Sequence, residues 1–273
     1  IDLFDNCLHA QQSLQSISLA TSELNIGNEC FTNCNSLSSI TLHNLNKAKI
    51  GVRALAGCVS LEKFELTTQS ELEIGDFCFS GAKKLHTVDI KYNDKLTFGQ
   101  SCFENCPALS SVSIKNDSNV DPVSDQSFII SSNPFAGCKS LANVTLASNS
   151  TLNLFSESFK DLYTLQSVEL TGNKIIIGDN CFENCFNIQK KYYNENRRII
   201  IKSASLVEIG SQCFKKSSYL ESVEITGMQI NIKKESFLGC ISLSSFSIPN
   251  LPERPIIGIK NDKFLLILIS LLE

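Results

Sequence analysis

A repeat of 23 or 24 residues runs along almost the whole chain and constrains the fold more than any other feature of the sequence. Its most conspicuous part reads CFTNC at Cys30–Cys34 and returns as CFENC at Cys102–Cys106 and Cys181–Cys185. One whole unit is IGNECFTNCNSLSSITL, at Ile26–Leu42. Self-similarity at a fixed period of this length indicates stacked structural repeats, so each motif is interpreted by its position in the unit.

The unit is anchored on a phenylalanine or leucine that recurs ten times. The anchors are Leu8, Phe31, Leu55, Phe79, Phe103, Phe135, Phe159, Phe182, Phe214 and Phe237. Seven of the nine steps between them are 23 or 24 residues, and the other two are 32, so two units carry insertions. We place these insertions near 115–134 and 194–206. We predict that Lys115–Asn133 and Asn194–Ser205 project as loops or a small hairpin, which either decorate a binding surface or are sequence drift.

Each part of the unit predicts a local structure. Segments such as LSSITL at Leu37–Leu42 alternate apolar and small polar residues, which is typical of a strand with one buried face. The segment around the anchor is too short for an independent α-helix, so we expect a single helical or 3₁₀ turn. The residue two places after the anchor is of a type that tolerates the left-handed conformation, which predicts a repeated C-cap. This column holds Asn33, Gly57, Gly81, Asn105, Gly137, Asp161, Asn184 and Gly239.

Repeated Ile-Gly pairs indicate a second short extended segment with a bend after it. One such unit cannot bury its own Leu, Phe and Ile side chains, whereas stacked units can. The sequence therefore predicts an α/β solenoid, curved, with a parallel sheet along one face. With 42% apolar and 19% charged residues and a net charge of −4, the chain has an ordinary globular composition. That charge favours neither nucleic acid nor an anionic membrane surface as partner.

The shared pattern IGxxAFxxCxxLxxVxL resembles the consensus of the BspA-like leucine-rich repeats. The resemblance covers residues 3–248 and implies a leucine-rich-repeat horseshoe or superhelix of about ten 23–24-residue units. It implies a parallel β-sheet on the concave face and short helical or 3₁₀ turns on the other. It also implies a cell-surface or secreted protein of mucosal bacteria or parasitic protists that engages host proteins or other cells.

One unit departs from this pattern. The eighth reads FNIQKKYY at Phe186–Tyr193 and places Lys191 where a buried β-branched residue is expected. In that register the outward positions of its strand are Lys190 and Tyr192.

The twelve cysteines fall into two columns of the repeat. Cys7, Cys30, Cys78, Cys102, Cys181 and Cys213 precede the anchor, and Cys34, Cys58, Cys106, Cys138, Cys185 and Cys240 follow it by three residues. Other units hold mostly small neutral residues there, which favours a packing role for the thiols. A zinc ligand would not tolerate such substitutes, so we expect neither metal nor cofactor. Disulfides between neighbouring units remain the alternative, with Cys34–Cys58 or Cys78–Cys102 as the pairs to test.

Catalytic motifs are absent from the sequence. It contains no G-x-S-x-G elbow, P-loop, G-x-G-x-x-G or H-E-x-x-H. The three histidines, His9, His43 and His86, occupy variable positions of three different units. We therefore expect a protein that is not an enzyme.

The outward residues of the predicted strands form the candidate partner-binding strip. It comprises Ser39, Thr41, Lys63, Glu65, Thr87, Asp89, Ser111, Ser113, Asn143, Thr145, Ser167, Glu169, Ser222 and Glu224. Ten strands would make a strip on the order of 45 Å long, which suits a protein or glycan ligand. Its small hydroxyl side chains are equally explained as protection against aggregation. The expected function is protein binding or adhesion at a cell surface or after secretion, and the alternative is an intracellular scaffold in the cytoplasm.

The repeat stops near residue 248, which predicts a solenoid domain at 1–248 and a separate segment at 249–273. That segment ends in FLLILISLL, at Phe264–Leu272. Nine apolar residues are too few to span a bilayer. They are expected to cap the solenoid or to begin a truncated membrane anchor, which is the one membrane contact that the sequence suggests.

Overall fold

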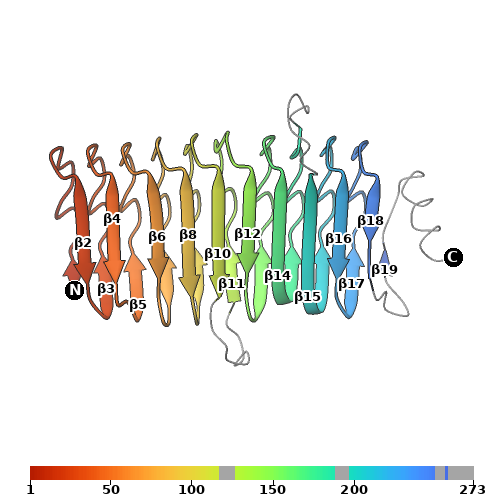
Figure 1. Cartoon of the computed structure of the whole chain (residues 1–273), viewed down its shortest axis with the longest axis horizontal. Coiled ribbons are helices and arrows are strands. Elements are labelled where there is room, and N and C mark those ends of the chain that lie inside the picture. Colours follow the sequence, from red (N-terminus) through yellow and green to blue (C-terminus); the bar gives the residue numbers. More distant parts are fainter. Residues whose placement is uncertain (117–126, 188–196, 250–255, 258–273) are drawn as a thin grey trace.

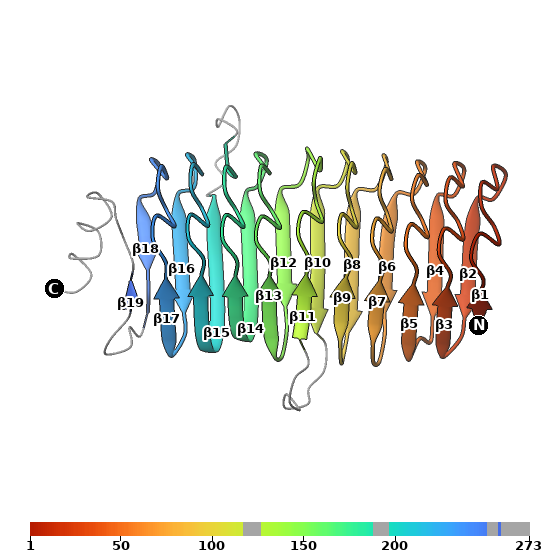
Figure 2. The same cartoon turned by 180° about the vertical axis from the view of Figure 1, so that it is seen from behind.

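Each repeat forms one turn of a parallel β-solenoid. The computed structural model describes residues 1–116, 127–187, 197–249 and 256–257. Most turns contribute two short strands, so that two rows of strands lie back to back along the molecule (Figures 1 and 2). The first and last described strands, β1 and β19, lie at opposite ends of the rod (Figure 1).

The first ladder contains the strands that follow the anchors. They are β2 (Ser16–Ala20), β4 (Ser39–His43), β6 (Lys63–Thr67), β8 (Thr87–Tyr92), β10 (Ser111–Asn116), β12 (Asn143–Ala147), β14 (Ser167–Ile177), β15 (Arg198–Ile209), β16 (Ser222–Thr226) and β18 (Ser245–Ser247). All their pairings are parallel and follow the repeat, as in Val112 opposite Val144. Alternate side chains, such as Phe64 and Leu66, point inward and are buried.

The second ladder contains the segments that end in the Ile-Gly pairs. Its strands are β1 (Asp2–Leu3), β3 (Glu23–Ile26), β5 (Lys47–Ile50), β7 (Leu72–Ile74), β9 (Leu96–Phe98), β11 (Ser127–Ile130), β13 (Thr151–Leu154), β17 (Gln229–Ile232) and β19 (Ile256–Ile257). Strands β14 and β15 run through both ladders, so hydrogen bonds link seventeen strands into one sheet. The predicted second extended segment is therefore a continuous row of strands.

The first ladder is interrupted between β4 and β6. Strands β2 and β4 form a separate two-stranded sheet, and the main sheet resumes at β6. Contacts survive at the two ends of the interruption, where the Glu62 N–H donates to the Ser38 carbonyl at 3.4 Å and Leu45 bridges Thr68. The second ladder is continuous alongside, because β5 pairs with both β3 and β7.

The expectation of helical or 3₁₀ turns is wrong, because none of the described residues is helical. Phe31 donates its N–H to the Ala54 carbonyl of the next unit at 2.8 Å, whereas Thr32 donates to Glu29, three residues back, at 3.2 Å. A helix would require consecutive N–H groups to bond within the turn. Two left-handed residues, Glu29 at φ 54° and Asn33 at φ 60°, also break any helical run. The second of these is the predicted C-cap column, and its conformation is confirmed.

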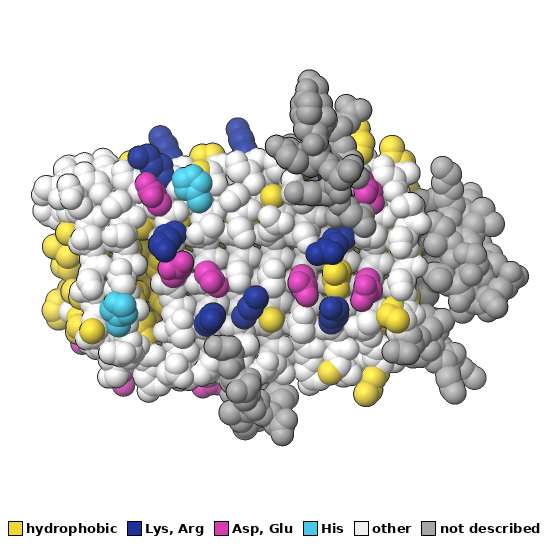
Figure 3. Space-filling model, in the orientation of Figure 1, with side chains coloured by type: hydrophobic (Ala, Val, Ile, Leu, Met, Phe, Trp, Pro, Cys, Tyr) yellow, Lys and Arg dark blue, Asp and Glu magenta, His cyan; other side chains and the backbone are white. Residues whose placement is uncertain are grey.

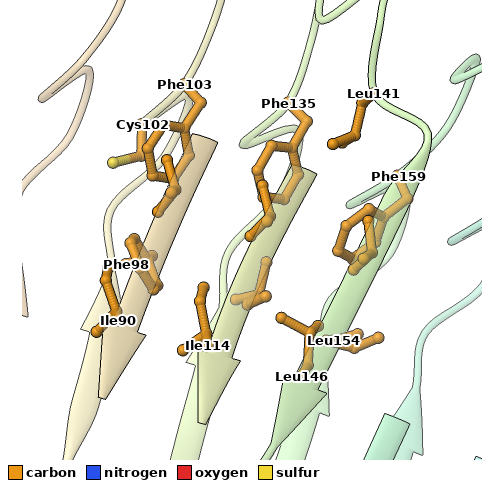
Figure 4. Packing of buried hydrophobic residues seen from close by; sticks show 14 of the residues in the cluster. Ile90, Phe98, Cys102, Phe103, Ile114, Phe135, Leu141, Leu146, Leu154 and Phe159 are labelled. Atoms are coloured by element: carbon orange, nitrogen blue, oxygen red, sulfur yellow. The ribbon is translucent and has the colours of Figure 1, made fainter. Parts of the chain in front are cut away.

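A stack of phenylalanine rings forms the centre of the core. From Phe79 to Phe237 the seven anchors lie ring on ring, with neighbouring centroids 4.9–5.4 Å apart and interplanar angles of 2–24°. Figure 4 shows Phe103, Phe135 and Phe159 in this stack, among aliphatic side chains of both ladders. These rings are at most 5% exposed, so the anchor column is the spine of the hydrophobic core.

The cysteines line the core, as the packing interpretation predicts. Ten of the twelve are buried, Cys240 is half-buried and Cys7 is exposed, and all are free thiols. Thiols of the second column also donate to the carbonyl of the preceding anchor, as Cys106 does to Phe79 at 3.2 Å. Ser217 makes the same contact with Phe182 through its hydroxyl group at 3.0 Å. The column therefore satisfies a buried carbonyl as well as filling space.

The predicted register of the eighth unit is wrong. Its strand is β15, in which Ile199 lies opposite Val168 and Val223. Because β15 begins at Arg198, the predicted projecting loop at Asn194–Ser205 is also wrong from that residue onward. Lys190, Lys191 and Tyr192 lie outside the described residues.

The first insertion is narrower than predicted. Lys115 and Asn116 end β10, and Ser127–Ile130 form β11, in register with its neighbours. At the other end of the chain, most of 249–273 lies outside the described residues, although β19 pairs with β17. Among the described residues, no helix has the length and apolar character needed to cross a membrane.

Candidate functional site

The outer face of the first ladder carries three rows of side chains that run along the solenoid. Row 1 comprises Ser16, Ser39, Lys63, Thr87, Ser111, Asn143, Ser167, Arg198, Ser222 and Ser245. Row 2 comprises Ser18, Thr41, Glu65, Asp89, Ser113, Thr145, Glu169, Ile200, Glu224 and Ser247. Row 3 comprises Ala20, His43, Thr67, Lys91, Lys115, Ala147, Thr171, Lys202 and Thr226.

All fourteen residues of the predicted strip lie in rows 1 and 2. Each is exposed or half-buried, while the residues between them on every strand point into the core. Along the chain these residues are scattered over almost 190 positions, from Ser39 to Glu224. The solenoid thus brings them onto one surface, and their role in binding remains a prediction.

Charges on this face are arranged by row. Row 2 holds all the carboxylates, and the cations lie in rows 1 and 3 on either side of it. Figure 3 shows two gatherings of charge, one over β6 to β10 and one over β14 to β16. Glu65 and Asp89 lie directly opposite each other, and Lys63 forms an ion pair with Glu65 at 3.1 Å. The flanking cations thereby offset the repulsion between neighbouring carboxylates.

Ile200 is the apolar centre of the second charged cluster. It lies half-buried in row 2, with Glu169 opposite it on β14 and Glu224 opposite it on β16. Arg198 and Lys202 lie on the same strand, two residues before and two residues after it, and both are exposed. Figure 3 shows this yellow patch bounded by magenta on two sides and dark blue on the other two. We call these five residues the Ile200 cluster.

Two parts of this surface are not predicted by the repeat pattern. The pattern predicts no third row because it ends at the second outward residue of each strand, whereas β8 and β10 extend beyond Lys91 and Lys115. The Ile200 cluster was missed because the eighth unit was placed in the wrong register. The run RIIIK was the available signal because, apart from Ile200, its polar and apolar positions match those of SVELT in the strand before it and SVEIT in the strand after it.

The interruption of the first ladder opens a groove of about 840 Å³ on the same face. Its floor includes Ile40, Leu42 and Leu66, which are 3–9% exposed, more than most of the core. Its rim is polar and includes Lys63 and Glu65. The groove therefore adjoins the first charged cluster and interrupts the otherwise even surface of the ladder.

This surface offers polar and charged groups that can make contacts. Within the described ranges, no group of three or more His, Cys, Asp and Glu side chains could hold a metal ion. His43 and His86 are exposed and belong to different units of the solenoid. What rows 1 to 3 offer is a long area of hydroxyl, acidic and basic groups with one apolar centre.

A family model for the BspA-type leucine-rich repeat region matches the chain with six copies, at residues 2–132 and 123–205. Together the two matches cover well over half of the chain. No match was found among curated proteins.

Two solved structures resemble the chain. One is a leucine-rich repeat protein from Bacteroides ovatus, with 20% identity, a TM-score of 0.37 and coverage of 93% of this chain and 77% of that one. The other is a leucine-rich cell surface protein from Faecalibacterium prausnitzii, with 17% identity, a TM-score of 0.28 and coverage of 91% and 83%.

Proposed function

Because the chain belongs to the BspA-type leucine-rich repeat family, we propose that it is a non-enzymatic, protein-binding module of a cell-surface or secreted protein, with rows 1 to 3 as its contact surface. Solenoids of stacked repeats present extended surfaces of this kind and use them to bind other macromolecules. Adhesion to another cell or to host protein is the role that fits such a surface outside the cell.

The observation that carries this proposal is the Ile200 cluster. An apolar side chain surrounded by charged groups has the layout of a small protein interface, with a centre that loses water on contact and a rim that stays polar. A partner with an aliphatic or aromatic side chain at Ile200 could place basic groups against Glu169 and Glu224 and acidic groups against Arg198 and Lys202. A ligand with charges of one sign would meet repulsion from one pair or the other. The cluster therefore favours a protein over nucleic acid or an acidic glycan.

The rest of the strip supplies area and orientation. Serine and threonine hydroxyls donate and accept hydrogen bonds and lose little side-chain entropy on contact. The rows contain no Trp, Tyr or Phe at the described positions, and these are common anchors of tight interfaces. The partner is therefore expected to bind with modest affinity at one module, and a longer array or several copies would strengthen attachment through avidity.

A comparison of variants tests the proposal. The purified chain is immobilised and exposed to surface-labelled proteins of epithelial cells, and each retained protein is then purified and its affinity measured. Ile200→Asp is expected to weaken binding of a true partner by roughly thirtyfold, the ~2 kcal/mol typical of a hot-spot residue. The triple variant Glu65→Lys/Asp89→Lys/Glu169→Lys is expected to weaken it as well, with a changed dependence on salt.

The matched control changes charges on the outer face of the second ladder. Glu23→Lys/Glu73→Lys alters two exposed carboxylates there, and Glu73 contributes only an exposed ion pair with Lys49. This control should bind as the unmodified chain does. If the strip variants and the control retain the same proteins with the same affinity, rows 1 to 3 are not the contact surface.

The alternative is an intracellular scaffold that uses the same surface. Its support is the set of free, buried thiols, because a reducing compartment keeps cysteines in that state. Labelling of intact cells with a reagent that does not cross membranes separates the two proposals. Labelling of the full-length protein supports the surface role, and labelling only after lysis supports the scaffold.

A further inference from the structure

Cys7 and Cys30 form a thiol pair that differs from all the other cysteines. Their sulfur atoms lie 3.0 Å apart, and Cys7 is the one exposed cysteine of the twelve. Cys30 is buried beneath it, at the same position of the next unit. In this pair a solvent-accessible thiol lies next to a buried thiol that a dissolved reagent cannot reach.

The backbone holds these two residues at a spacing that suits a covalent link. The Leu8 N–H donates to the Cys30 carbonyl at 3.0 Å, and the Asn6 N–H donates to the Asn28 carbonyl at 2.9 Å, so the first two turns run side by side. Backbones hydrogen-bonded in this way lie about 4.8 Å apart, within the Cα separation that a disulfide accepts. The sulfurs need to approach by roughly 1 Å to reach bonding distance.

We propose that Cys7 and Cys30 are a modification site that a small-molecule disulfide, such as oxidised glutathione, converts to a disulfide bond. In the first step, the Cys7 thiolate attacks one sulfur of the small disulfide, forms a mixed disulfide and releases one small thiolate. In the second step, the Cys30 thiolate attacks the Cys7 sulfur and displaces the second small thiol. Two protein thiols lose two protons and two electrons, and one small disulfide becomes two thiols.

The order of the two steps follows from the surroundings of each sulfur. Burial and the contact with Cys7 raise the pKa of the Cys30 thiol to about 12, so Cys30 is a poor first nucleophile. Cys7 is exposed and able to meet the reagent in solution. Once Cys7 is in the mixed disulfide, Cys30 is the thiol held next to its sulfur, so the second step is intramolecular.

The link would fasten the first turn of the array to the second. The apolar residues Leu8, Leu14 and Ile17 of the first described turn are half-buried and pack against the core of the following turns. Repeats whose apolar side chains are only partly buried open more readily than fully buried ones. A disulfide between residues 23 positions apart limits this opening.

Other cysteines that are neighbours within a column serve as internal controls. Cys78 and Cys102 occupy the same column as the proposed pair, and Cys106 and Cys138 occupy the other, but all four are buried. A dissolved oxidant cannot reach them in the folded chain. The proposal therefore predicts one disulfide at Cys7–Cys30, with the other thiols left free.

The experiment uses the whole purified chain, first reduced and then incubated with oxidised glutathione. Free thiols are blocked with N-ethylmaleimide in denaturant, and the chain is digested and analysed by mass spectrometry. The expected result is a Cys7–Cys30 cross-linked peptide, with Cys78, Cys102, Cys106 and Cys138 blocked by maleimide. The oxidised chain should also lose its first unit to protease on the order of tenfold more slowly than the reduced chain.

Two variants complete the test. In Cys30→Ser, Cys7 should stop at the mixed disulfide with glutathione, whereas Cys7→Ser should acquire neither glutathione nor a cross-link at Cys30. A mixed disulfide at Cys7 in the unmodified chain without a cross-link, no reaction at all, or cross-links formed equally at the buried pairs would each overturn the proposal. The reaction needs no binding partner, so its outcome is independent of the test of the contact surface.

Discussion

Glycine occupies two columns of the repeat for different physical reasons. At Gly75, as at the other Ile-Gly pairs in the described turns, φ is not left-handed, but an added Cβ would lie 2.7 Å from backbone atoms of Gly51 and Val52. At Gly81 φ is 76°, and the nearest atoms to an added Cβ are 3.9 Å away. One column is glycine because neighbouring turns approach closely, and the other because the backbone is left-handed.

We expect Gly75→Ala to be the more damaging of the two alanine substitutions. Its methyl group must push two backbones apart, which should cost about 3 kcal/mol, the upper range for inserting a methyl group into packed structure. Gly81→Ala adds only the strain of a left-handed alanine, about 1 kcal/mol. Urea denaturation of both variants beside the unmodified chain measures the difference. Equal losses would mean that close approach of the turns does not constrain the Gly75 position.

The buried thiols should make the stability of the protein depend on pH above neutrality. Burial raises the pKa of the Cys58 thiol to about 12, whereas an unfolded thiol ionises near 8.5. Between these values the unfolded chain releases a proton that the folded chain keeps, so the free energy of unfolding falls as pH rises. The contribution is fully present below about pH 8.5 and is lost by about pH 12.

Cys58→Ser isolates this contribution from the other titrating groups. Between pH 9 and 11, under reducing conditions, the unmodified chain should lose about 1.4 kcal/mol more per pH unit than the variant does. Denaturant midpoints at several pH values provide the measurement. Parallel curves for the two proteins would show that Cys58 does not keep its proton in the folded state.

The two left-handed columns show how far residue identity predicts backbone conformation. The column of Asn33 and Gly57 was predictable because it holds residue types that tolerate positive φ. The other column holds Glu29, Arg53 and Phe77, at φ 54–55°. These residue types do not favour positive φ, so the sequence did not indicate a left-handed conformation there. Its conformation is imposed by hydrogen bonds to the next turn, which a propensity argument for a single unit does not include.

At the scale of elements, the anchor segment forms a turn and not a helix, because part of its backbone hydrogen bonding goes to the next unit. Every second N–H group of the segment donates to the next unit, as Phe31 does to Ala54. The spacing of the repeat predicts only that this segment is short. Short connecting segments often form one 3₁₀ turn, which is why a helical turn was expected. The strands were predictable in detail because their alternation reflects burial on one face, which the stack preserves in every unit.

The phenylalanine stack should tolerate leucine better than alanine. Phe159 is fully buried, with its centroid 5.0 Å from that of Phe135 and 4.9 Å from that of Phe182. Phe159→Ala removes both ring contacts and leaves a cavity, which should cost about 4 kcal/mol. Phe159→Leu should cost roughly half as much, because Leu55 fills the same column in another unit.

Thermal and urea denaturation of both variants checks this order. Because unfolding of a repeat array need not be two-state, the midpoint of each transition is compared, followed separately by far-UV circular dichroism and proteolysis. A result in which both variants lose equal stability would show that volume in this column matters less than ring contact.

At the scale of the molecule, the residues that make up rows 1 to 3, the proposed contact surface, are set by the register of the strands. Fourteen of these residues were predictable because the strand pattern recurs unchanged in most units, and stacking aligns equal positions. The Ile200 cluster was not, because β15 lies eight residues further along the sequence than the regular repeat places it, with Arg198 in row 1 instead of Lys190. A shift of that kind changes which side chains face outward, although the alternation within the strand is intact.

The interruption between β4 and β6 should be the weakest point of the first ladder. In an array where each unit contacts only its neighbours, stability is approximately a sum over units and the interfaces between them. The interface between the second and third units lacks the hydrogen bonds that join β6 to β8, and it keeps its bonds in the second ladder. The two N-terminal units should therefore separate from the rest more readily than any interior pair with a complete ladder.

Hydrogen exchange followed by mass spectrometry locates such an opening directly. Peptides that cover 39–43 and 63–67 should exchange at least tenfold faster than peptides that cover 87–92 and 111–116, because N–H groups facing the gap have no ladder partner. At low urea concentrations, residues 1–50 should lose protection from exchange before the interior does.

The control variant is Gly99→Ala, which alters the second ladder beyond the gap. It should speed exchange in its own units and leave the difference in exchange rate between β4 and β8 unchanged. Uniform protection from β4 to β10 would mean that β4 and β6 are hydrogen-bonded in solution and that the groove is closed.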